Sequence, residues 1–318
     1  MKTNRLIVFA GFLLTAALAG CGGNAAAPVE EPPVPDEPAE TATPVPLPTD
    51  TPAPTEDPGP WKRALQVDPV KFAVTVAGFY DETTGITAGY AGEVHYTSDG
   101  GKSWPAGANR SACRFGMDIL DGQRAWTIGN QGNVRYTRDG GKTWEALADV
   151  PTGLSQFISM ADEQTGWAAS SSRLVATADG GQTWTPVTLP AELKGIAAID
   201  LRVPGEGYVL DGLGVLYVSG DGGTSWTAKP LGLEGKISAP RDLPMAAVRF
   251  LDSRNGVAVV NAVKGDGTLR EMRTSDGGDT WVQTFLPEKV GILFLTRDAG
   301  YLTIFRGDNS IVVLRYRP

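Results

Sequence analysis

Short runs of alternating apolar and polar residues follow one another along residues 61–318. The runs GEVHY at 92–96 and GNVRY at 132–136 place every second side chain on one face, which is the period of a half-buried β-strand. Gly-rich turns separate the runs, and the chain contains 40 Gly and 23 Pro beside 42% apolar residues. This pattern predicts an all-β fold of short strands and tight turns around a substantial core.

One octapeptide, [ST]-x-Asp-Gly-Gly-x-[ST]-Trp, follows five of these runs. Asp-Gly and Gly-Gly supply the positive φ angles of a tight hairpin turn, and the Asp can accept hydrogen bonds from its own turn amides. The Trp is large enough to lie between neighbouring sheets. We interpret these Asp and Trp residues as structural: Asp99, Trp104, Asp139, Trp144, Asp179, Trp184, Asp221, Trp226, Asp276 and Trp281.

The spacing of the octapeptides indicates the architecture. Their Asp residues are separated by 40, 40, 42 and 55 residues, and a period near 40 built from short strands predicts a β-propeller with one four-stranded blade per repeat. A second recurring mark is Asp followed four residues later by Gly or Ala, as at Asp81 and Asp121, and its six full or partial copies give six blades. A seven-bladed ring is the alternative, and it would need a hidden repeat.

The two ends of this region complement each other. The last repeat lacks an octapeptide, whereas residues 61–67 resemble an outer strand with nothing before it. We expect residues 61–67 to add the fourth strand to the last blade, because closing the ring removes exposed sheet edges. The sequence therefore predicts a β-propeller over residues 61–318 that is closed by its N-terminal strand.

The first 60 residues have a different composition. Lys2 and Arg5 precede the apolar run 6–18, and Ala19-Gly20-Cys21 follows, as in a secretory signal. The Cys at the cleavage position resembles the lipobox of bacterial lipoproteins, which implies a signal peptide at 1–20, a lipid on Cys21 and a location on the outer side of a cell membrane. An ordinary signal peptide is the alternative.

Residues 21–60 are expected to form a disordered tether. Residues 22–60 hold 12 of the 23 prolines and eight acidic residues without a basic one. Such a segment cannot bury enough apolar surface to offset its conformational entropy.

Composition also excludes several functions. One His and two Cys do not suffice for a four-ligand Cys/His zinc site or a disulfide scaffold. The net charge of −8 argues against a nucleic-acid partner, since such binding depends on a basic surface. We therefore expect no metal, no cofactor and no nucleic acid.

The octapeptides match the Asp-box of the bacterial neuraminidase repeat (BNR) families, over about 76–318. With the regular spacing and the lipoprotein signal, the chain most resembles the photosystem II stability/assembly-factor family. That resemblance implies a propeller without enzymatic activity that binds a protein partner during assembly of a membrane complex. A glycan-binding or sialidase-like glycoside hydrolase is the alternative, although the Arg-Ile-Pro motif of sialidases is absent from the domain start, VDPVKF at 67–72. A purely structural envelope protein is a third interpretation.

No catalytic group emerges from the sequence. His95 is the only imidazole, and we interpret it as a strand residue, just as Arg306-Gly307-Asp308 is interpreted as a turn. The candidate binding residues lie on loops expected to open on the face opposite the octapeptides, where clustered Arg suits a carboxylate-bearing partner and a solvated rim is the alternative. They are Arg110, Arg114, Arg173, Asp211 and Arg241.

Overall fold

The computed structural model describes residues 60–72, 74–89, 92–108, 116–129, 131–151, 156–233, 237, 246–261, 268–289 and 291–316. The chain divides into two units, Met1–Ala53 and Pro54–Pro318, and every described residue belongs to the second. The predicted signal peptide, Cys21 and the tether up to residue 59 lie outside the described residues. Within the described residues no helix is long and apolar enough to cross a membrane.

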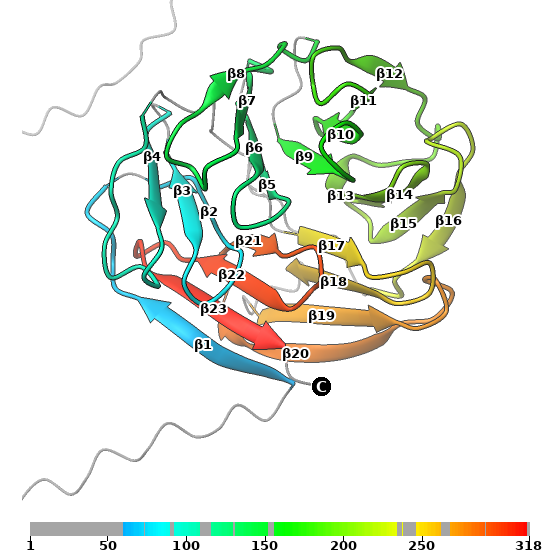
Figure 1. Ribbon diagram of the computed structural model, residues 1–318. Coiled ribbons are helices and arrows are strands. Elements are labelled where there is room, and N and C mark those ends of the chain that lie inside the picture. Colours follow the sequence, from blue (N-terminus) through cyan, green and yellow to red (C-terminus); the bar gives the residue numbers. More distant parts are fainter. Residues whose placement is uncertain are drawn as a thin grey trace, which may run out of the picture. The chain divides into compact units, whose positions relative to one another are not determined.

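The described residues form six antiparallel sheets arranged around a common centre, which is a β-propeller of six blades (Figure 1). Blade 1 contains β2 (Val76–Phe79), β3 (Gly85–Ala88) and β4 (Val94–Thr97). Blade 2 contains β5 (Gly116–Ile119), β6 (Ala125–Ile128), β7 (Val134–Thr137) and β8 (Glu145–Ala146). Blade 3 contains β9 (Phe157–Met160), β10 (Gly166–Ala169), β11 (Leu174–Thr177) and β12 (Thr185–Val187).

The second half of the ring follows the same order from the inner to the outer strand. Blade 4 contains β13 (Ile196–Val203), β14 (Glu206–Asp211), β15 (Val215–Ser219) and β16 (Thr227–Pro230). Blade 5 contains β17 (Ala246–Phe250), β18 (Gly256–Asn261), β19 (Thr268–Thr274) and β20 (Val282–Lys289). Blade 6 contains β21 (Ile292–Leu295), β22 (Tyr301–Phe305), β23 (Ile311–Tyr316) and β1 (Trp61–Val67). The prediction of six blades is confirmed.

The N-terminal strand closes the ring as predicted. β1 pairs antiparallel with β23, from Trp61 opposite Tyr316 to Val67 opposite Ile311. In Figure 1 the blue β1 lies beside the red β23. The sheet order β1-β23-β22-β21 thus combines both ends of the domain in one blade.

Blade 1 has three regular strands. The place of its outer strand is taken by a single bridge between His95 and Ala106, with Tyr96 N–H donating to Pro105 O (3.1 Å) and Gly107 N–H to Val94 O (2.9 Å). Pro105 has no N–H to donate, so a regular ladder cannot start there.

The octapeptides form the expected turns. In the third copy, Asp179 accepts hydrogen bonds from Thr177 Oγ1 (2.8 Å), Thr183 N–H (2.8 Å) and Thr183 Oγ1 (2.6 Å). Gly180 and Gly181 have φ angles of 74° and 92°, which L side chains rarely adopt. The corresponding bonds recur in the other four copies.

The octapeptide Trp side chains lie between blades. Trp144 of blade 2 packs with Ile86 and Val94 of blade 1. The ring centroid of Trp226 in blade 4 is 5.7 Å from that of Trp167 in blade 3. These two indole rings therefore pack against side chains of the preceding blade.

We expect these turns to make the domain sensitive to acid. Hydrogen bonds from a Ser or Thr hydroxyl and from the amide of the same residue hold the pKa of Asp99, Asp179 and Asp221 at about 2, below the ordinary 3.8. A lowered folded-state pKa adds stability that is complete above the ordinary pKa and is lost as the pH falls through the folded pKa. We expect the free energy of unfolding, measured in urea, to fall steeply between about pH 4 and pH 2. D179N should show a shallower fall, and equal slopes in both proteins would contradict this account.

Candidate functional site

Six structurally equivalent positions line the centre of the ring, one on each inner strand. In each blade the next residue along the inner strand pairs with the start of the second strand. Those next residues are Phe79, Ile119, Met160, Leu201, Phe250 and Leu295. None of the residues at the six positions was predicted from the sequence to have a role in the site. In blades 2 to 5 these positions are polar and buried, although most other residues of the inner strands are apolar. The six residues are Gly78, Asp118, Ser159, Asp200, Arg249 and Phe294.

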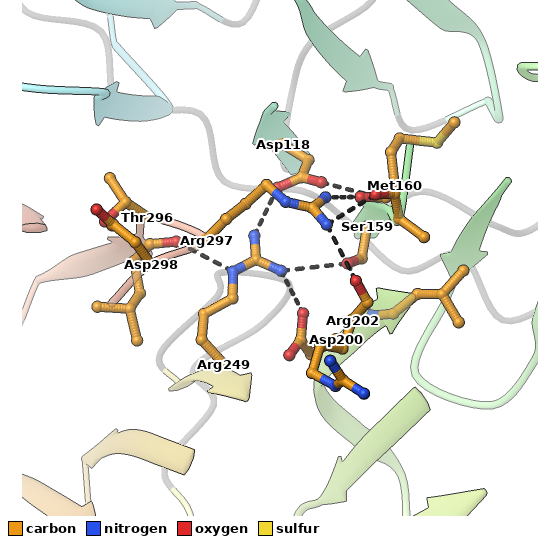
Figure 2. A network of polar contacts seen from close by, with 12 residues as sticks. Asp118, Ser159, Met160, Asp200, Arg202, Arg249, Thr296, Arg297 and Asp298 are labelled. Carbon is orange, nitrogen blue, oxygen red and sulfur yellow. Dashed lines mark hydrogen bonds and ion pairs between the residues drawn. The ribbon is translucent and has the colours of Figure 1, made fainter. Parts of the chain in front are cut away.

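Arg249 of blade 5 connects four other blades (Figure 2). Its Nη1 donates to Asp200 Oδ1 (2.8 Å) and Ser159 Oγ (3.1 Å). Its Nη2 donates to Asp118 Oδ1 (2.5 Å), and its Nε donates to Leu295 O (3.1 Å). Only 7% of Arg249 is exposed, so these bonds form in a poorly hydrated interior.

The same side chains bind the backbone of the next blade. Asp118 Oδ2 accepts from Met160 N–H (2.8 Å), Ser159 Oγ from Leu201 N–H (3.0 Å), and Asp200 Oδ2 from Phe250 N–H (2.7 Å). Each inner strand from blade 2 to blade 4 is thus fixed to its successor by one side chain. A buried polar group with such complete pairing rigidifies its surroundings.

Arg297 adds a second guanidinium beside this network (Figure 2). It donates to the backbone carbonyls of Met160, Ala161 (2.8 Å) and Arg202 (3.2 Å). It therefore joins blade 6 to blades 3 and 4 without using a carboxylate.

The charges of the network are strongly coupled. Burial raises the pKa of Asp200 above its ordinary value, although Arg249 opposes that shift. Burial by itself would lower the pKa of Arg249, but the charges of Asp118 and Asp200 raise it above its ordinary value. We conclude that Arg249 stays protonated and neutralises part of the negative charge.

A small hollow, the axial pocket, lies beside Arg249 where the inner strands begin. Its volume is about 60 Å³, and all six inner strands contribute to it. Its wall is mostly apolar, including Met117, Phe157, Val248 and Leu293. A hollow of this size is far below the volume that drug-sized ligands need. It suits the tip of one side chain of a larger partner.

The predicted binding residues are only partly described. Arg110, Arg114 and Arg241 lie outside the described residues; in the sequence they precede β5 and β17, whose first residues line the axial pocket. Arg173 is exposed in the turn between β10 and β11 and borders a separate hollow of about 300 Å³.

The carboxylate of Asp211 binds nearby backbone amides. It is 1% exposed, and its carboxylate accepts from the N–H groups of Leu213 (2.9 Å), Val215 (2.9 Å) and Lys194 (3.1 Å). We therefore leave Asp211 out of the proposed binding surface.

Two further motifs have structural roles. His95 lies in β4 and stacks on Phe72 with ring centroids 3.7 Å apart. In the Arg306-Gly307-Asp308 turn, Arg306 pairs with buried Glu288 and Asp308 accepts from Ser310 N–H (2.9 Å). Within the described ranges, no group of three or more His, Cys, Asp or Glu could hold a metal ion.

A recurring offset could have revealed the central network. Asp118, Ser159 and Arg249 each lie three residues before the Asp of the second mark, at Asp121, Asp162 and Asp252. Their different chemistry hides the equivalence, because a repeat search expects similar residues at similar positions.

The ring, its closing strand and its octapeptide turns define a six-bladed β-propeller of the Asp-box class. Residues 111–243 match the family described as photosynthesis system II assembly factor YCF48. The resemblance inferred from the octapeptides is thereby confirmed over a little less than half of the chain. A comparison with curated proteins finds no match.

Solved structures share the fold. One, described as YCF48 bound to D1 peptide, is 16% identical, with a TM-score of 0.51 over 84% of this chain and 99% of that chain. A second, YCF48 from Cyanidioschyzon merolae, is 19% identical, with a TM-score of 0.48 over 81% of this chain and 98% of that chain. A virginiamycin B lyase from Staphylococcus aureus is 12% identical, with a TM-score of 0.53 over 76% of this chain and 80% of that chain. At these identities the likeness to the first and third structures, whose TM-scores exceed 0.5, establishes the fold alone.

Proposed function

We propose that this protein is a lipid-anchored, extracytoplasmic propeller that binds a protein partner and serves as an assembly or stability factor for a membrane complex. The observation that carries the proposal is the axial pocket. It is a small apolar hollow held by the rigid Arg249 network, at the end of the domain where the segments that carry Arg110, Arg114 and Arg241 lead into β5 and β17.

The chemistry of this end suits a peptide segment with a carboxylate. An apolar side chain would enter the axial pocket, and the Arg side chains would bind the carboxylate by charge-assisted hydrogen bonds. The relatives support this assignment, since one solved YCF48 structure contains a D1 peptide and residues 111–243 match that family.

We propose a binding role without catalysis. A glycosidase of the common type needs two carboxyl groups free to act on opposite sides of a bond. Asp118 and Asp200 face the centre of the ring, but both oxygens of each accept hydrogen bonds from Arg249 or from backbone amides. They hold the blades together and are not available for proton transfer.

The proposed anchor depends on Cys21. Replacing Cys21 by Ser should release the protein from membranes into the soluble extracytoplasmic fraction, because a single acyl-carrying residue provides the attachment. Fractionation followed by immunoblotting measures this. If the C21S protein still sediments with membranes, the anchor is not at Cys21.

The partner can be sought at the axial pocket. Ala247 lines the pocket and is half-buried, so A247E places a carboxylate there without removing a core side chain. Ala228 is exposed on the outer strand β16 and offers the matched control A228E. We expect a membrane pull-down with A247E, or with Arg110, Arg114 and Arg241 all changed to Ala, to lose a protein that the wild type and A228E retain. An unchanged set of captured proteins would contradict the axial site.

A further inference from the structure

A groove lies between blades 2 and 3 at the opposite end of the domain from the axial pocket. It has a volume of about 940 Å³ and is bordered by the turn after β5, the strands β6 to β8 and the octapeptide turn of blade 3. Blade 2 contributes Trp126, Tyr136 and Glu145, and blade 3 contributes Glu163 and Gln164. We call this hollow the inter-blade groove.

An aromatic row forms one wall of the inter-blade groove. Trp126, Tyr136 and Glu145 are direct cross-strand neighbours on β6, β7 and β8. The rings of Trp126 and Tyr136 have centroids 4.5 Å apart. Trp126 is 1% exposed, and its indole N–H donates no hydrogen bond to any described residue. The wall therefore contains a buried donor without a hydrogen-bond partner among the described residues.

The groove carries an excess of negative charge. Its lining includes two basic residues and four acidic ones, so its net charge is −2: Arg124, Arg138, Asp121, Glu145, Glu163 and Asp179. Arg124 is shared between Asp121 and Glu163, and Arg138 binds Glu145 Oε1 (2.5 Å). Glu145 and Glu163 both use Oε1 in these ion pairs, and their side chains are 52% and 47% exposed.

The charged residues of the groove act on the hydroxyl of Tyr136. Burial raises the pKa of Tyr136, and the charge of Glu163 raises it further, while Arg138 and Arg124 act in the opposite direction. Tyr136 therefore stays protonated at neutral pH, and its side chain reports on the charge within the groove.

We propose that the inter-blade groove binds an extended segment of a protein partner through a Lys or Arg side chain, with Glu145 and Glu163 as its counter-ions. A cation would neutralise the excess negative charge of the carboxylates, and it would be attracted to the ring faces of the aromatic row by a cation–π interaction. The backbone of the same segment supplies carbonyl acceptors, which a free cation cannot do. A neutral glycan would not neutralise the excess negative charge of the groove, and an anionic ligand would be repelled by it.

This second surface is independent of the proposed axial site. The turn Asp121–Arg124 follows β5 and the octapeptide turns follow the third strands, whereas the axial pocket lies where the inner strands begin. One propeller could therefore contact a carboxylate-bearing segment at one end and a basic segment at the other.

The test uses the full chain with 3-fluorotyrosine at position 136 and the probe acetyl-Lys-Lys-Lys-Lys-amide. The acidic segment 22–60 also attracts a basic peptide, so a ¹⁹F resonance inside the groove is needed to isolate this site. We expect a saturable shift of that resonance at low salt, which weakens as salt screens half-exposed charges. A label at Tyr301, in blade 6, should not shift.

Matched variants decide the outcome. E145Q together with E163Q should weaken binding at position 136 by at least about fivefold, since two carboxylate contacts are lost. E192Q, at an exposed position outside the groove, should leave binding unchanged. An unmoved resonance, an equal response in the double variant, or a shift caused by acetyl-Glu-Glu-Glu-Glu-amide or by maltotriose would overturn the proposal. The A247E variant should bind the Lys peptide normally, so failure of the axial site would not affect this result.

Discussion

Replacing Arg249 by Met is expected to lower the free energy of unfolding by about 3–5 kcal/mol at pH 7, the usual effect of removing one partner from a buried ion pair. Asp118 and Asp200 are 0% and 3% exposed, and both accept hydrogen bonds from Arg249. Without the guanidinium, two buried carboxylates would lose the cation that pairs with both of them. Chemical denaturation of the two proteins measures the loss.

The loss should depend on pH in a defined direction. Burial raises the folded-state pKa of Asp200, and without Arg249 nothing in that ion pair would oppose the shift. The folded variant would then bind more protons than the unfolded one, so its stability would increase as the pH falls through the raised pKa of Asp200. We expect R249M to recover part of its stability between pH 7 and about pH 5, where the wild type gains little.

Two controls separate charge from shape. R249K keeps the positive charge, but its single nitrogen has three N–H donors for the four hydrogen bonds that Arg249 makes in a planar fork, so R249K should be of intermediate stability. Changing Asp118 and Asp200 to Asn in the R249M background removes the uncompensated charges and should restore part of the loss at pH 7. If R249M is as stable as the wild type at pH 7, or is equally destabilised at every pH, the network does not hold the blades as described.

The repeats could be predicted because their signals are local. Asp179, Gly180, Gly181 and Trp184 form a turn whose hydrogen bonds join residues within five positions of one another, so the chemistry is visible in a single sequence. The closing strand was also predictable, because 61–67 and the last repeat are incomplete in complementary ways. The outer edge of blade 1 was not predicted, since a Pro after Trp104 reduces its fourth strand to one bridge.

The centre of the ring was beyond prediction for a physical reason. Arg249 binds Asp118, which is 131 residues away in the sequence, and Ser159, which is 90 residues away. Such contacts arise only after six blades have assembled, and no property of the individual strands requires them. Asp211 shows the opposite case: a residue that the sequence suggested for binding has a carboxylate that accepts hydrogen bonds from three backbone N–H groups. The binding role of Arg110, Arg114 and Arg241, which lie outside the described residues, stays a prediction.

Loss of the closing strand should have an effect at least as large as loss of Arg249. β1 supplies the outer strand of blade 6 and also binds blade 5 through two buried glutamates. Trp61 Nε1 donates to Glu271 Oε1 (2.7 Å), and Arg63 Nη2 donates to Glu288 Oε1 (2.5 Å). Glu271 is 0% exposed and also accepts from Thr284 Oγ1 (2.7 Å). Its carboxylate therefore depends on donors from β1 and β20.

Point variants at Trp61 separate the contribution of ring packing from that of the indole hydrogen bond. Trp61 is 1% exposed, and its ring meets Tyr316 edge-on with centroids 5.4 Å apart. W61A should therefore lower the free energy of unfolding by about 3–5 kcal/mol, the range for truncation of a buried aromatic side chain. W61F keeps most of the packing but leaves Glu271 without the indole donor, which should lower it by about 1–3 kcal/mol.

Deleting residues 61–68 removes the whole strand and leaves β23 as an unpaired edge beside the apolar residues that Trp61 covers. We expect this deletion to abolish the cooperative thermal transition or to lower the melting temperature far more than W61A does. Deleting residues 22–50 is the control for chain shortening, and it should leave the melting temperature unchanged because it lies before the closing strand. Equal melting temperatures for the two deletions would show that the ring is stable without β1, and that the pairing with β23 adds little to it.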